Sequence, residues 1–344
     1  YDPLSFDKYF WWHPRGALGS ARHGSPYSVE PDPEPVKRPA RRITLLTKRN
    51  FDWAAIDRPE TDWPDRKVAD WAAGFLAKKH EQPFFLAVGL FRPHVPWYNP
   101  RKFVKRFPLE KIKLPLVKEN DLDDLGPWAK ARAHDRNSKH DKVVEFGEWK
   151  PAVQAYRASI SFSDAMLGRV LDALDAGPNA RDTLIVFWSD HGYHLGEHTF
   201  WQKNNLHEEV LRVPLIISVP GSKAGRSKSI VELMDLFPTL SELAGLRIPK
   251  TLQGVSLAPI LADKSATVKE SALSFVSAGI SMRSKDWTFT RYADGSEELY
   301  DMSKDRGQFT NLVKDSKFGM VLKKQRAAFD QRIAAAGIKV KKSK

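Results

Sequence analysis

The sequence has no cysteine among its 344 residues, and this absence excludes disulfides, thiolate metal sites and a cysteine nucleophile within the chain. No run approaches the ~20 consecutive apolar residues that a membrane helix needs, so we expect no membrane association. A P-loop, a G-x-G-x-x-G turn and a G-x-S-x-G nucleophile elbow are also missing. The commonest nucleotide-binding and serine-hydrolase signatures are therefore excluded.

Positive charge is concentrated at one end of the chain. The sequence carries 55 basic and 42 acidic residues, a formal net charge of +13. Residues 314–344 hold ten Lys or Arg and two Asp, a net contribution of +8. We favour a solvated helix face followed by a frayed end. A patch for a polyanion such as a sulfated glycan is the alternative, and the scarcity of interleaved aromatic residues argues against nucleic acid.

The apolar pattern predicts helices alternating with strands over most of the chain. Pro64 opens a helix that runs to Leu76, and Phe84–Leu90 has the composition of a buried strand. Further helices are predicted over 156–174 and 231–243, and further strands over 184–188 and 213–219. Residues 101–150 lack clear periodicity, which predicts an insertion or a substrate loop.

The pattern changes after residue 262. Short strands are predicted over 272–276, 287–292 and 298–300, with a turn at 293–296 and a final helix that carries Leu322, Phe329 and Ile333 on one face. The chain therefore predicts an α/β region over 1–262 and a small α+β region over 263–344, which ends in the basic tail.

The most informative stretch joins an apolar strand to a polar turn. Leu184 to Trp188 is a continuous apolar run, as expected for a strand covered on both faces, and Ser189-Asp190-His191-Gly192 follows at once. Ligands of open α/β sheets bind just beyond the carboxyl ends of strands. Asp190 offers a hard oxygen suited to Ca²⁺ or Mg²⁺, and His191 offers a softer nitrogen. An Asx-turn that binds nothing explains the triplet equally well.

Two further residues are candidates for binding an anion. His94 follows the predicted strand Phe84–Leu90 between two prolines, on the expected same rim as Asp190. Lys203 lies in a polar loop and could bind phosphate or sulfate as a point charge. Both residue types are more often only hydrogen-bonded or solvated.

His194 and His198 have the i, i+4 spacing of a helical metal pair, and Glu197 lies between them. Gly192 and Gly196 argue against a helix at this place, so we discount a metal site built from these residues.

Two specific stretches carry a resemblance to a known family. One runs from Phe187 to His198 and continues to Lys203, and the other runs from Phe84 to Pro96. They resemble signatures of the type I sulfatases, and most of all those of the iduronate-2-sulfatase-like branch. Supporting stretches are Asp235-Leu-Phe-Pro-Thr-Leu240, Leu299-Tyr-Asp301 and Asn311-Leu312. The resemblance covers nearly the whole chain.

The resemblance implies an alkaline-phosphatase-like α/β fold, in which a mixed sheet is flanked by helices and a small α+β C-terminal subdomain follows. Residues 1–262 would then be the remainder of the catalytic domain, and 263–344 the subdomain. It also implies Ca²⁺ and hydrolysis of a sulfate ester of a carbohydrate, with a formylglycine made from a C/S-x-P-x-R motif as the nucleophile.

Site roles are carried over by position. Asp190 and His191 would be metal ligands, and the His favours the iduronate-2-sulfatase-like branch because many sulfatases have Asn there. His94 and Lys203 would contact the sulfate, with Lys203 near the leaving oxygen. Tyr193 would line the pocket. Arg92 would contact substrate where a Lys is usual, which keeps the charge and changes its shape.

The sequence departs from the family at three places. It contains no C/S-x-P-x-R motif, no early Asp-Asp metal pair and no Gly-Lys-x-x-His stretch. All three normally precede the region where Tyr1 begins, so we expect a C-terminal portion of a sulfatase whose N-terminal portion is missing. The chain shows no signal peptide, and a periplasmic or secreted location is a family expectation.

Two alternative functions stay open. One is a phosphodiesterase or phosphonate hydrolase of the same superfamily, since phosphate and sulfate are nearly isosteric. The other is an inactive split or degenerate sulfatase fragment.

Overall fold

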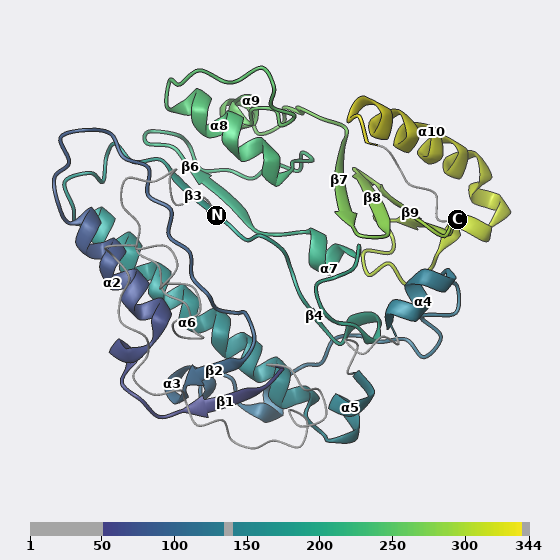
Figure 1. Ribbon diagram of the computed structural model, residues 1–344, viewed down its shortest axis with the longest axis horizontal. Coiled ribbons are helices and arrows are strands. Elements are labelled where there is room, and N and C mark those ends of the chain that lie inside the picture. The colour runs from purple at the N-terminus through teal and green to yellow at the C-terminus, as the bar shows by residue number, and fades with distance from the viewer. Residues whose placement is uncertain (1–50, 134–139, 339–344) are drawn as a thin grey trace, which may run out of the picture. The chain divides into compact units, whose positions relative to one another are not determined.

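The computed structural model describes residues 51–133 and 140–338, which form two compact units (Figure 1). Unit 1 comprises residues 51–114 and 141–183, and unit 2 comprises 184–338 with the described part of 115–140. The end of the basic tail, 339–344, lies outside the described residues. The domain boundary that we expect after residue 262 stays a prediction, because the units group residues by proximity rather than by independent folding.

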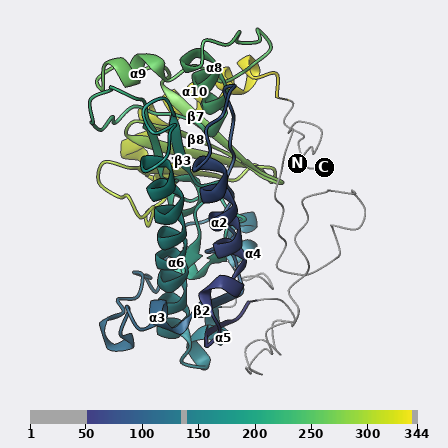
Figure 2. The same cartoon turned by 90° about the vertical axis from the view of Figure 1, so that its left-hand side faces the viewer.

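Unit 1 is built on two long helices that lie side by side (Figure 2). Helix α2 (Pro64–Leu76) begins at Pro64, as predicted, because the first turn of a helix has no use for the missing amide. Helix α6 (Trp149–Asp175) packs against it and begins before its predicted start. The other elements are β1 (Trp53–Ile56), η3 (Glu60–Asp62), β2 (Trp97–Pro100), α3 (Arg101–Val104), η4 (Leu109–Lys111) and α5 (His140–Glu145).

The core of unit 1 is aromatic. Strands β1 and β2 pair in parallel and bring Trp53 opposite Trp97. Their ring centroids are 5.9 Å apart, and Phe51 lies 5.3 Å from Trp53. All three side chains are at most 2% exposed. Full burial of such a side chain contributes roughly 1.5–3 kcal/mol or more, so this cluster stabilises the β1–β2 pair against α6.

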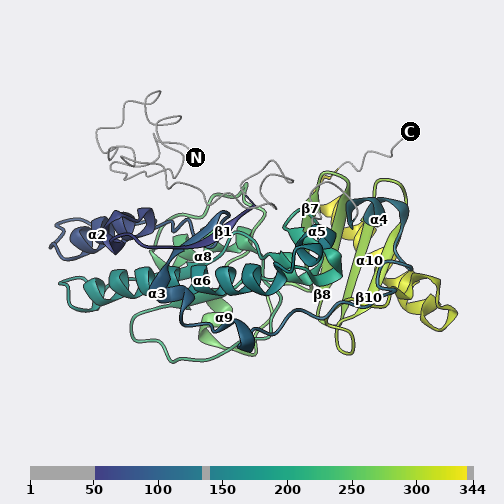
Figure 3. The same ribbon diagram turned by 90° about the horizontal axis from the view of Figure 1, so that it is seen from below.

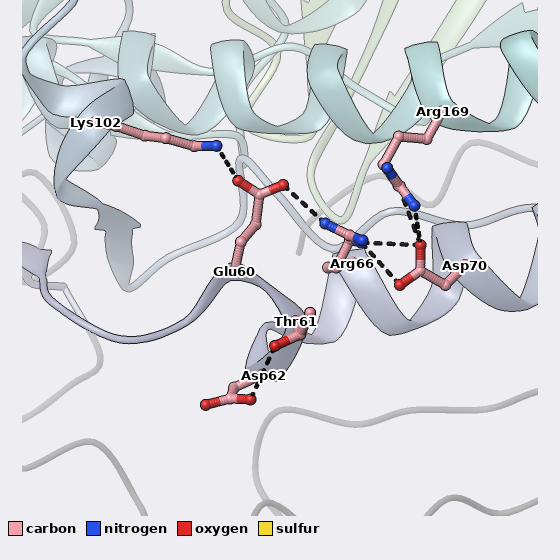
Figure 4. A network of polar contacts seen from close by, with 7 residues as sticks. All are labelled: Glu60, Thr61, Asp62, Arg66, Asp70, Lys102 and Arg169. Atoms are coloured by element: carbon pink, nitrogen blue, oxygen red, sulfur yellow. Dashed lines mark hydrogen bonds and ion pairs between the residues drawn. The ribbon is translucent and has the colours of Figure 1, made fainter.

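A network of ion pairs joins α2 to its neighbours (Figure 4). Arg66 Nε lies 2.8 Å from Asp70 Oδ2 one turn along α2, and Arg169 Nη2 of α6 lies 2.6 Å from Asp70 Oδ1. Glu60 accepts from Arg66 and pairs with Lys102. Burial would raise the pKa of Asp70, but the hydrogen bonds from Arg169 and Arg66 outweigh it and lower that pKa. Most of these side chains are partly exposed, so each pair contributes only ~0.2–1 kcal/mol.

The predicted buried strand Phe84–Leu90 is wrong. Among the described residues no strand pairs with this segment, which forms no regular element. Phe85 is 70% exposed and Val88 is 36% exposed. An apolar run shows that a segment has side chains suited to a buried strand. Whether the strand forms also depends on a neighbouring strand that can hydrogen-bond to it.

Unit 2 contains a four-stranded antiparallel sheet with the order β10-β9-β8-β7. Its strands are β7 (Ser271–Val276), β8 (Gly279–Ser284), β9 (Trp287–Tyr292) and β10 (Glu297–Asp301). Helix α10 (Gly319–Ala335) packs along it (Figure 3) and buries Phe329 and Ile333 against Met282, Phe289 and Leu299. The predicted strands, turn and helix of this region are confirmed, whereas β8 was not predicted.

The rest of unit 2 carries shorter elements. Strands β3 (Ile185–Trp188) and β6 (Leu215–Ser218) form an antiparallel pair, and so do β4 (His194–Leu195) and β5 (Trp201–Gln202). The helical elements are α4 (Pro127–Ala133), η5 (Glu197–Thr199), α7 (Glu208–Leu211), η6 (Leu233–Asp235), α8 (Leu236–Leu243), α9 (Ala258–Ala262), η7 (Leu312–Lys314) and η8 (Ser316–Phe318). No helix of the described residues has the length and apolarity that crossing a bilayer would require.

The strands β3 and β6 occur where they were predicted, but the burial expected for β3 is wrong. Phe187 is 37% exposed, Trp188 is 48% exposed and Ile216 on β6 is 60% exposed. Only two strands form this sheet among the described residues, so their apolar side chains lack a covering layer there.

Candidate functional site

The polar turn begins directly after β3. Ser189 Oγ donates to His191 O at 3.0 Å, and His191 N donates to Asp190 Oδ1 at 3.0 Å. These two hydrogen bonds pair polar groups of the turn with one another. The Asp190 side chain is 73% exposed, and its Oδ2 lies 3.5 Å from His191 Nε2. The turn therefore presents a carboxylate oxygen and an imidazole nitrogen together, as the sequence predicts for a strand end.

Gly192 allows this turn to lie against another segment of unit 2. Its amide donates to Val210 O at 2.7 Å. A Cβ at position 192 would lie 1.9 Å from Glu209 O, a backbone atom that cannot move aside. Glycine is therefore required here by close approach of two backbones.

His191 is oriented by its own neighbour. Its Nδ1 is 2.7 Å from Gly192 O, an acceptor, so Nδ1 carries the proton and Nε2 presents a lone pair. Lys203 Nζ lies 2.6 Å from this Nε2. Asp190, His191 and Lys203 thus form one constellation of donors and charge; the resemblance implied that they share a site, whereas the local pattern gave Lys203 only as a separate anion-binding candidate.

Lys203 is placed by a hairpin whose backbone is unusual. Strands β4 and β5 pair antiparallel, and Lys203 follows β5 directly. Three residues of the hairpin other than glycine have positive φ angles: His198 (54°), Thr199 (60°) and Gln202 (85°). His194 lies in a strand, and Gly196 has φ 118°, so the expectation that no helix pairs His194 with His198 is confirmed. Tyr193, the predicted pocket residue, is half-buried one position after Gly192.

Arg92 and His94 lie in unit 1, in a loop that is firmly held. The buried carboxylate of Asp65 accepts from the amides of Phe91 (2.7 Å) and Arg92 (3.0 Å). The Arg92 guanidinium donates through Nε and Nη2 to Tyr98 O at 3.1 and 2.8 Å. Burial lowers the pKa of Arg92, and Asp65 opposes that shift. This placement favours a structural use of the guanidinium.

His94 is exposed, and its Nδ1 lies 2.7 Å from Val95 O. Because that carbonyl is an acceptor, Nδ1 carries the proton and the tautomer is defined. His94 and the Asp190 turn belong to different units, so their membership of one site stays a prediction.

The sequence around this constellation matches a known protein family. The family model of the sulfatases matches residues 25–246. The chain belongs to the sulfatase family. A second model, that of the C-terminal part of N-sulphoglucosamine sulphohydrolase, matches residues 196–334. Both stretches that carried the resemblance lie within the first match.

Curated relatives agree with this assignment. A sulfatase of Formosa agariphila is 36% identical over 275 residues, which cover 79% of this chain and 54% of the relative. Iduronate 2-sulfatase of Homo sapiens is 34% identical over 233 residues, which cover 56% of this chain and 42% of the relative. This sulfatase-family chain spans about half the length of the curated relatives it matches.

Solved structures confirm the predicted alkaline-phosphatase-like fold. A structure described as a complex with its substrate D-glucosamine-2-N,6-O-disulfate has a TM-score of 0.67 at 20% identity, covering 79% of this chain and 69% of the other. A phosphonate monoester hydrolase of Silicibacter pomeroyi has a TM-score of 0.70 at 22% identity, covering 80% and 60%. At such identities the likeness establishes the fold alone.

The sulfatase-family chain offers two adjacent metal donors, Asp190 and His191. Their chemistry fits a divalent cation, since Asp190 has an exposed carboxylate and His191 Nε2 carries a lone pair, which in this structure faces Lys203 Nζ at 2.6 Å. Within residues 51–133 and 140–338, no group of three or more His, Asp or Glu side chains has the geometry to hold a metal. The pair alone would therefore supply only part of a coordination shell.

A buried histidine cluster, not predicted from the sequence, joins two residues of the hairpin, His194 and His198, to His207. His198 Nδ1 lies 2.7 Å from Asp121 Oδ2, and its ring stacks on His207 with centroids 4.3 Å apart. Burial lowers the pKa of His194 to about 3, and it lowers the pKa of His207 well below its usual value. Burial also acts to lower the pKa of His198, but the hydrogen bond with Asp121 and its charge outweigh that effect and raise it. Asp121 is 77 residues distant in sequence, so no local spacing could have indicated the pair.

Proposed function

We propose that the complete protein hydrolyses a sulfate ester of a carbohydrate by a formylglycine- and Ca²⁺-dependent mechanism. The observation that carries this proposal is the constellation of Asp190, His191 and Lys203, with Lys203 Nζ 2.6 Å from His191 Nε2. Membership of the sulfatase family supports it.

The residues of this chain would act mainly by electrostatics. Asp190 Oδ2 would hold Ca²⁺ together with His191 Nε2 once the Lys203 ammonium turns from Nε2 toward the substrate, and the bound ion would supply charge stabilisation of the sulfuryl group. Lys203 would donate to the oxygen that leaves with the alcohol, where negative charge develops. His94 would hydrogen-bond the sulfate, and Arg92 would keep the His94 loop in shape through Tyr98 O. The formylglycine would come from a C/S-x-P-x-R motif, which this sequence does not contain.

The activities for which relatives are named support the substrate class. A Delta 4,5-hexuronate-2-O-sulfatase of Bacteroides thetaiotaomicron is 32% identical over 289 residues, covering 76% of this chain and 59% of the relative. Together with the iduronate 2-sulfatase, it favours a sulfated glycan as the partner. We further propose a periplasmic or extracellular location, where such glycans occur.

A test of this function uses the complete coding region, expressed with the formylglycine-generating machinery. We expect release of sulfate from an aryl sulfate and from a 2-O-sulfated uronate disaccharide. Lys203→Ala should lower kcat by about 10²-fold or more, as loss of a donor to developing charge does in other enzymes. Lys304→Ala is a matched control, because Lys304 is an exposed lysine whose side chain is 80% accessible. An unchanged kcat in Lys203→Ala would remove Lys203 from the reaction.

A second candidate function is hydrolysis of phosphonate or phosphate diesters. The likeness to the phosphonate monoester hydrolase favours it at the level of the fold. A direct comparison of kcat/KM for an aryl sulfate and an aryl phosphonate monoester separates the two. A ratio in favour of the phosphonate would replace the sulfatase proposal, and no turnover of either would favour an inactive chain.

A further inference from the structure

The hairpin that presents Lys203 is held in a conformation that its own sequence does not favour. His198, Thr199 and Gln202 all have left-handed φ angles, of 54°, 60° and 85°. Such angles are uncommon for residues other than glycine, and they persist only where surrounding contacts determine them. The contacts that hold this backbone therefore also determine where Lys203 lies.

The strongest of these contacts is made by His198. Its side chain is 3% exposed, that of Asp121 is 1% exposed, and Nδ1 lies 2.7 Å from Asp121 Oδ2. One face of the ring stacks on His207 at an interplanar angle of 16°, and Phe309 lies 5.2 Å away. A charge-assisted hydrogen bond between buried groups is stronger and more directional than one in water.

Asp121 belongs to a segment that is itself fixed. Three residues later, Asp124 Oδ2 accepts from Asn311 N at 2.7 Å, and Asp124 O accepts from Asn311 Nδ2 at 3.1 Å. Asn311 Oδ1 in turn accepts from the amide of Leu299 in β10 at 3.0 Å. The carboxylate that binds His198 is thereby connected to the four-stranded sheet, which has a helix-covered core.

The cluster does not have the geometry of a metal site. Within the part of the chain that the structure describes, no three of its ionisable side chains converge on a common point. The rings of His198 and His207 lie face to face rather than edge to edge, so their nitrogens do not point at a shared ligand. A structural use of the His198–Asp121 pair fits these contacts better.

We propose that His198 and Asp121 are positioning residues for Lys203: their buried pair fixes the left-handed hairpin and so holds the Lys203 ammonium beside His191 Nε2. What Lys203 then does rests on the proposed sulfatase function. Where Lys203 lies does not depend on that function, so the two can be tested separately.

Two substitutions of His198 distinguish the effect of its hydrogen bond with Asp121 from the effect of packing its ring against His207. His198→Phe keeps an aromatic ring against His207 but loses the Nδ1 donor and disfavours positive φ. His198→Asn places an amide donor near the former Nδ1 and tolerates positive φ, as asparagine commonly does. We expect His198→Phe to lower kcat on an aryl sulfate by on the order of 10²-fold, with little change in KM. His198→Asn should stay within about tenfold of the wild type.

His207→Phe is the matched control. His207 is buried in the same cluster, and neither of its ring nitrogens has a hydrogen-bond partner among the residues that the structure describes. Its replacement keeps the stacked ring and leaves the His198–Asp121 pair intact. We expect kcat and the environment of Lys203 to be unchanged in this variant.

A second readout does not require enzymatic activity. Trace labelling with an amine-reactive reagent, followed by mass spectrometry, reports the reactivity of Lys203 relative to the exposed Lys304. We expect Lys203 to react more slowly than Lys304 in the wild type, His198→Asn and His207→Phe. In His198→Phe its relative rate should rise toward that of Lys304, because the ammonium leaves its place beside His191.

The outcomes distinguish this inference from the proposed function. A changed labelling rate in His198→Phe supports positioning even if the wild type hydrolyses no sulfate ester. An unchanged rate in folded His198→Phe overturns positioning, whatever the activity. Folding is checked by near-ultraviolet circular dichroism. If His198→Phe does not fold, Asp121→Asn removes the charge of the pair without changing its shape, and the same labelling shift, smaller in size, decides the question.

Discussion

Two sheets of unit 2 differ in their surroundings: one forms a packed core, and the other is exposed and leads into the candidate site. The four-stranded sheet buries Met282, Phe289 and Leu299 beneath α10. The β3–β6 pair leaves Trp188 48% exposed and Ile216 60% exposed, yet the turn with Asp190 and His191 begins where β3 ends. Most of the hydrophobic stabilisation of unit 2 is therefore expected from the first sheet, and the candidate chemistry from the edge of the second.

The comparison teaches that apolar composition and burial are separate properties. Strand β3 reads Ile-Val-Phe-Trp and is more apolar than β9, which contains two threonines. Nevertheless Thr288 and Thr290 of β9 are at most 2% exposed, because β8 and β10 flank them and because their face of the sheet, opposite α10, packs through Tyr292 against other segments of unit 2. A side chain is buried by what lies opposite it, and this is set by topology rather than by its own strand.

The largest effect is expected in the core of the four-stranded sheet. Phe289→Ala should lower the free energy of unfolding by about 3–5 kcal/mol, since Phe289 is fully buried and packs edge-on against Phe329 at 5.2 Å. Phe275→Ala in the same sheet is the matched control, because Phe275 is 51% exposed, and it should cost less than about 1 kcal/mol. Urea titration followed by far-ultraviolet circular dichroism measures both. Equal losses would contradict the assignment of the core.

The next effect concerns a buried carboxyl group in β10. Burial raises the pKa of Glu298 to about 7, against the hydrogen bonds from Tyr292 and Tyr300. The folded protein therefore binds this proton more tightly than the unfolded chain does. The resulting stabilisation is complete below the unfolded pKa of 4.5 and is lost as the pH rises through about 7.

Glu298→Gln should remove that pH dependence. In the wild type this group should account for a loss of about 2–3 kcal/mol between pH 5 and pH 8. The measurement is the free energy of unfolding across this pH range. Glu297→Gln is the neighbouring control for the substitution itself, because Glu297 precedes Glu298 in β10 and pairs with Arg291 at 2.9 Å. Parallel slopes in Glu298→Gln and wild type would show that Glu298 does not titrate in this range.

The smallest effect is expected on the β3–β6 pair. Ile216→Thr keeps a β-branched side chain at a position that is 60% exposed, so the free energy of unfolding of this chain should change by less than about 0.5 kcal/mol. Ile280→Thr in β8 is the comparison, since Ile280 packs against the core of the four-stranded sheet, and it should cost about 1–3 kcal/mol. A loss at Ile216 as large as that at Ile280 would mean that the face is covered in solution.

Features that depend on neighbours in sequence were predictable. The start of α2 at Pro64 follows from the geometry of a first turn, and the end of β3 follows from the polar residues after Trp188. The resemblance to the sulfatases further indicated that the turn with Asp190 and His191, and Lys203, belong to the site. The predicted helix begins at Tyr156, whereas α6 begins at Trp149 and includes Pro151, which a first turn tolerates.

Features that depend on distant partners were not predictable. Phe84–Leu90 has the composition of a strand, but among the described residues no partner strand pairs with it. The His198–Asp121 pair joins residues whose local sequences carry no sign of each other. The need for glycine at position 192 was not predictable either, because the backbone that excludes a Cβ there is that of Glu209 in α7.

The 77-residue separation of Asp121 and His198 also has a kinetic consequence. Closing so long a loop is entropically unfavourable, and the left-handed hairpin has little tendency to form before the loop closes. During synthesis the Asp121 segment leaves the ribosome well before the hairpin does. The His198–Asp121 pair therefore cannot form until the hairpin has also emerged. Lys203 is therefore expected to reach its place late in folding, after the sheet to which Asn311 ties Asp124, three residues beyond Asp121, has formed.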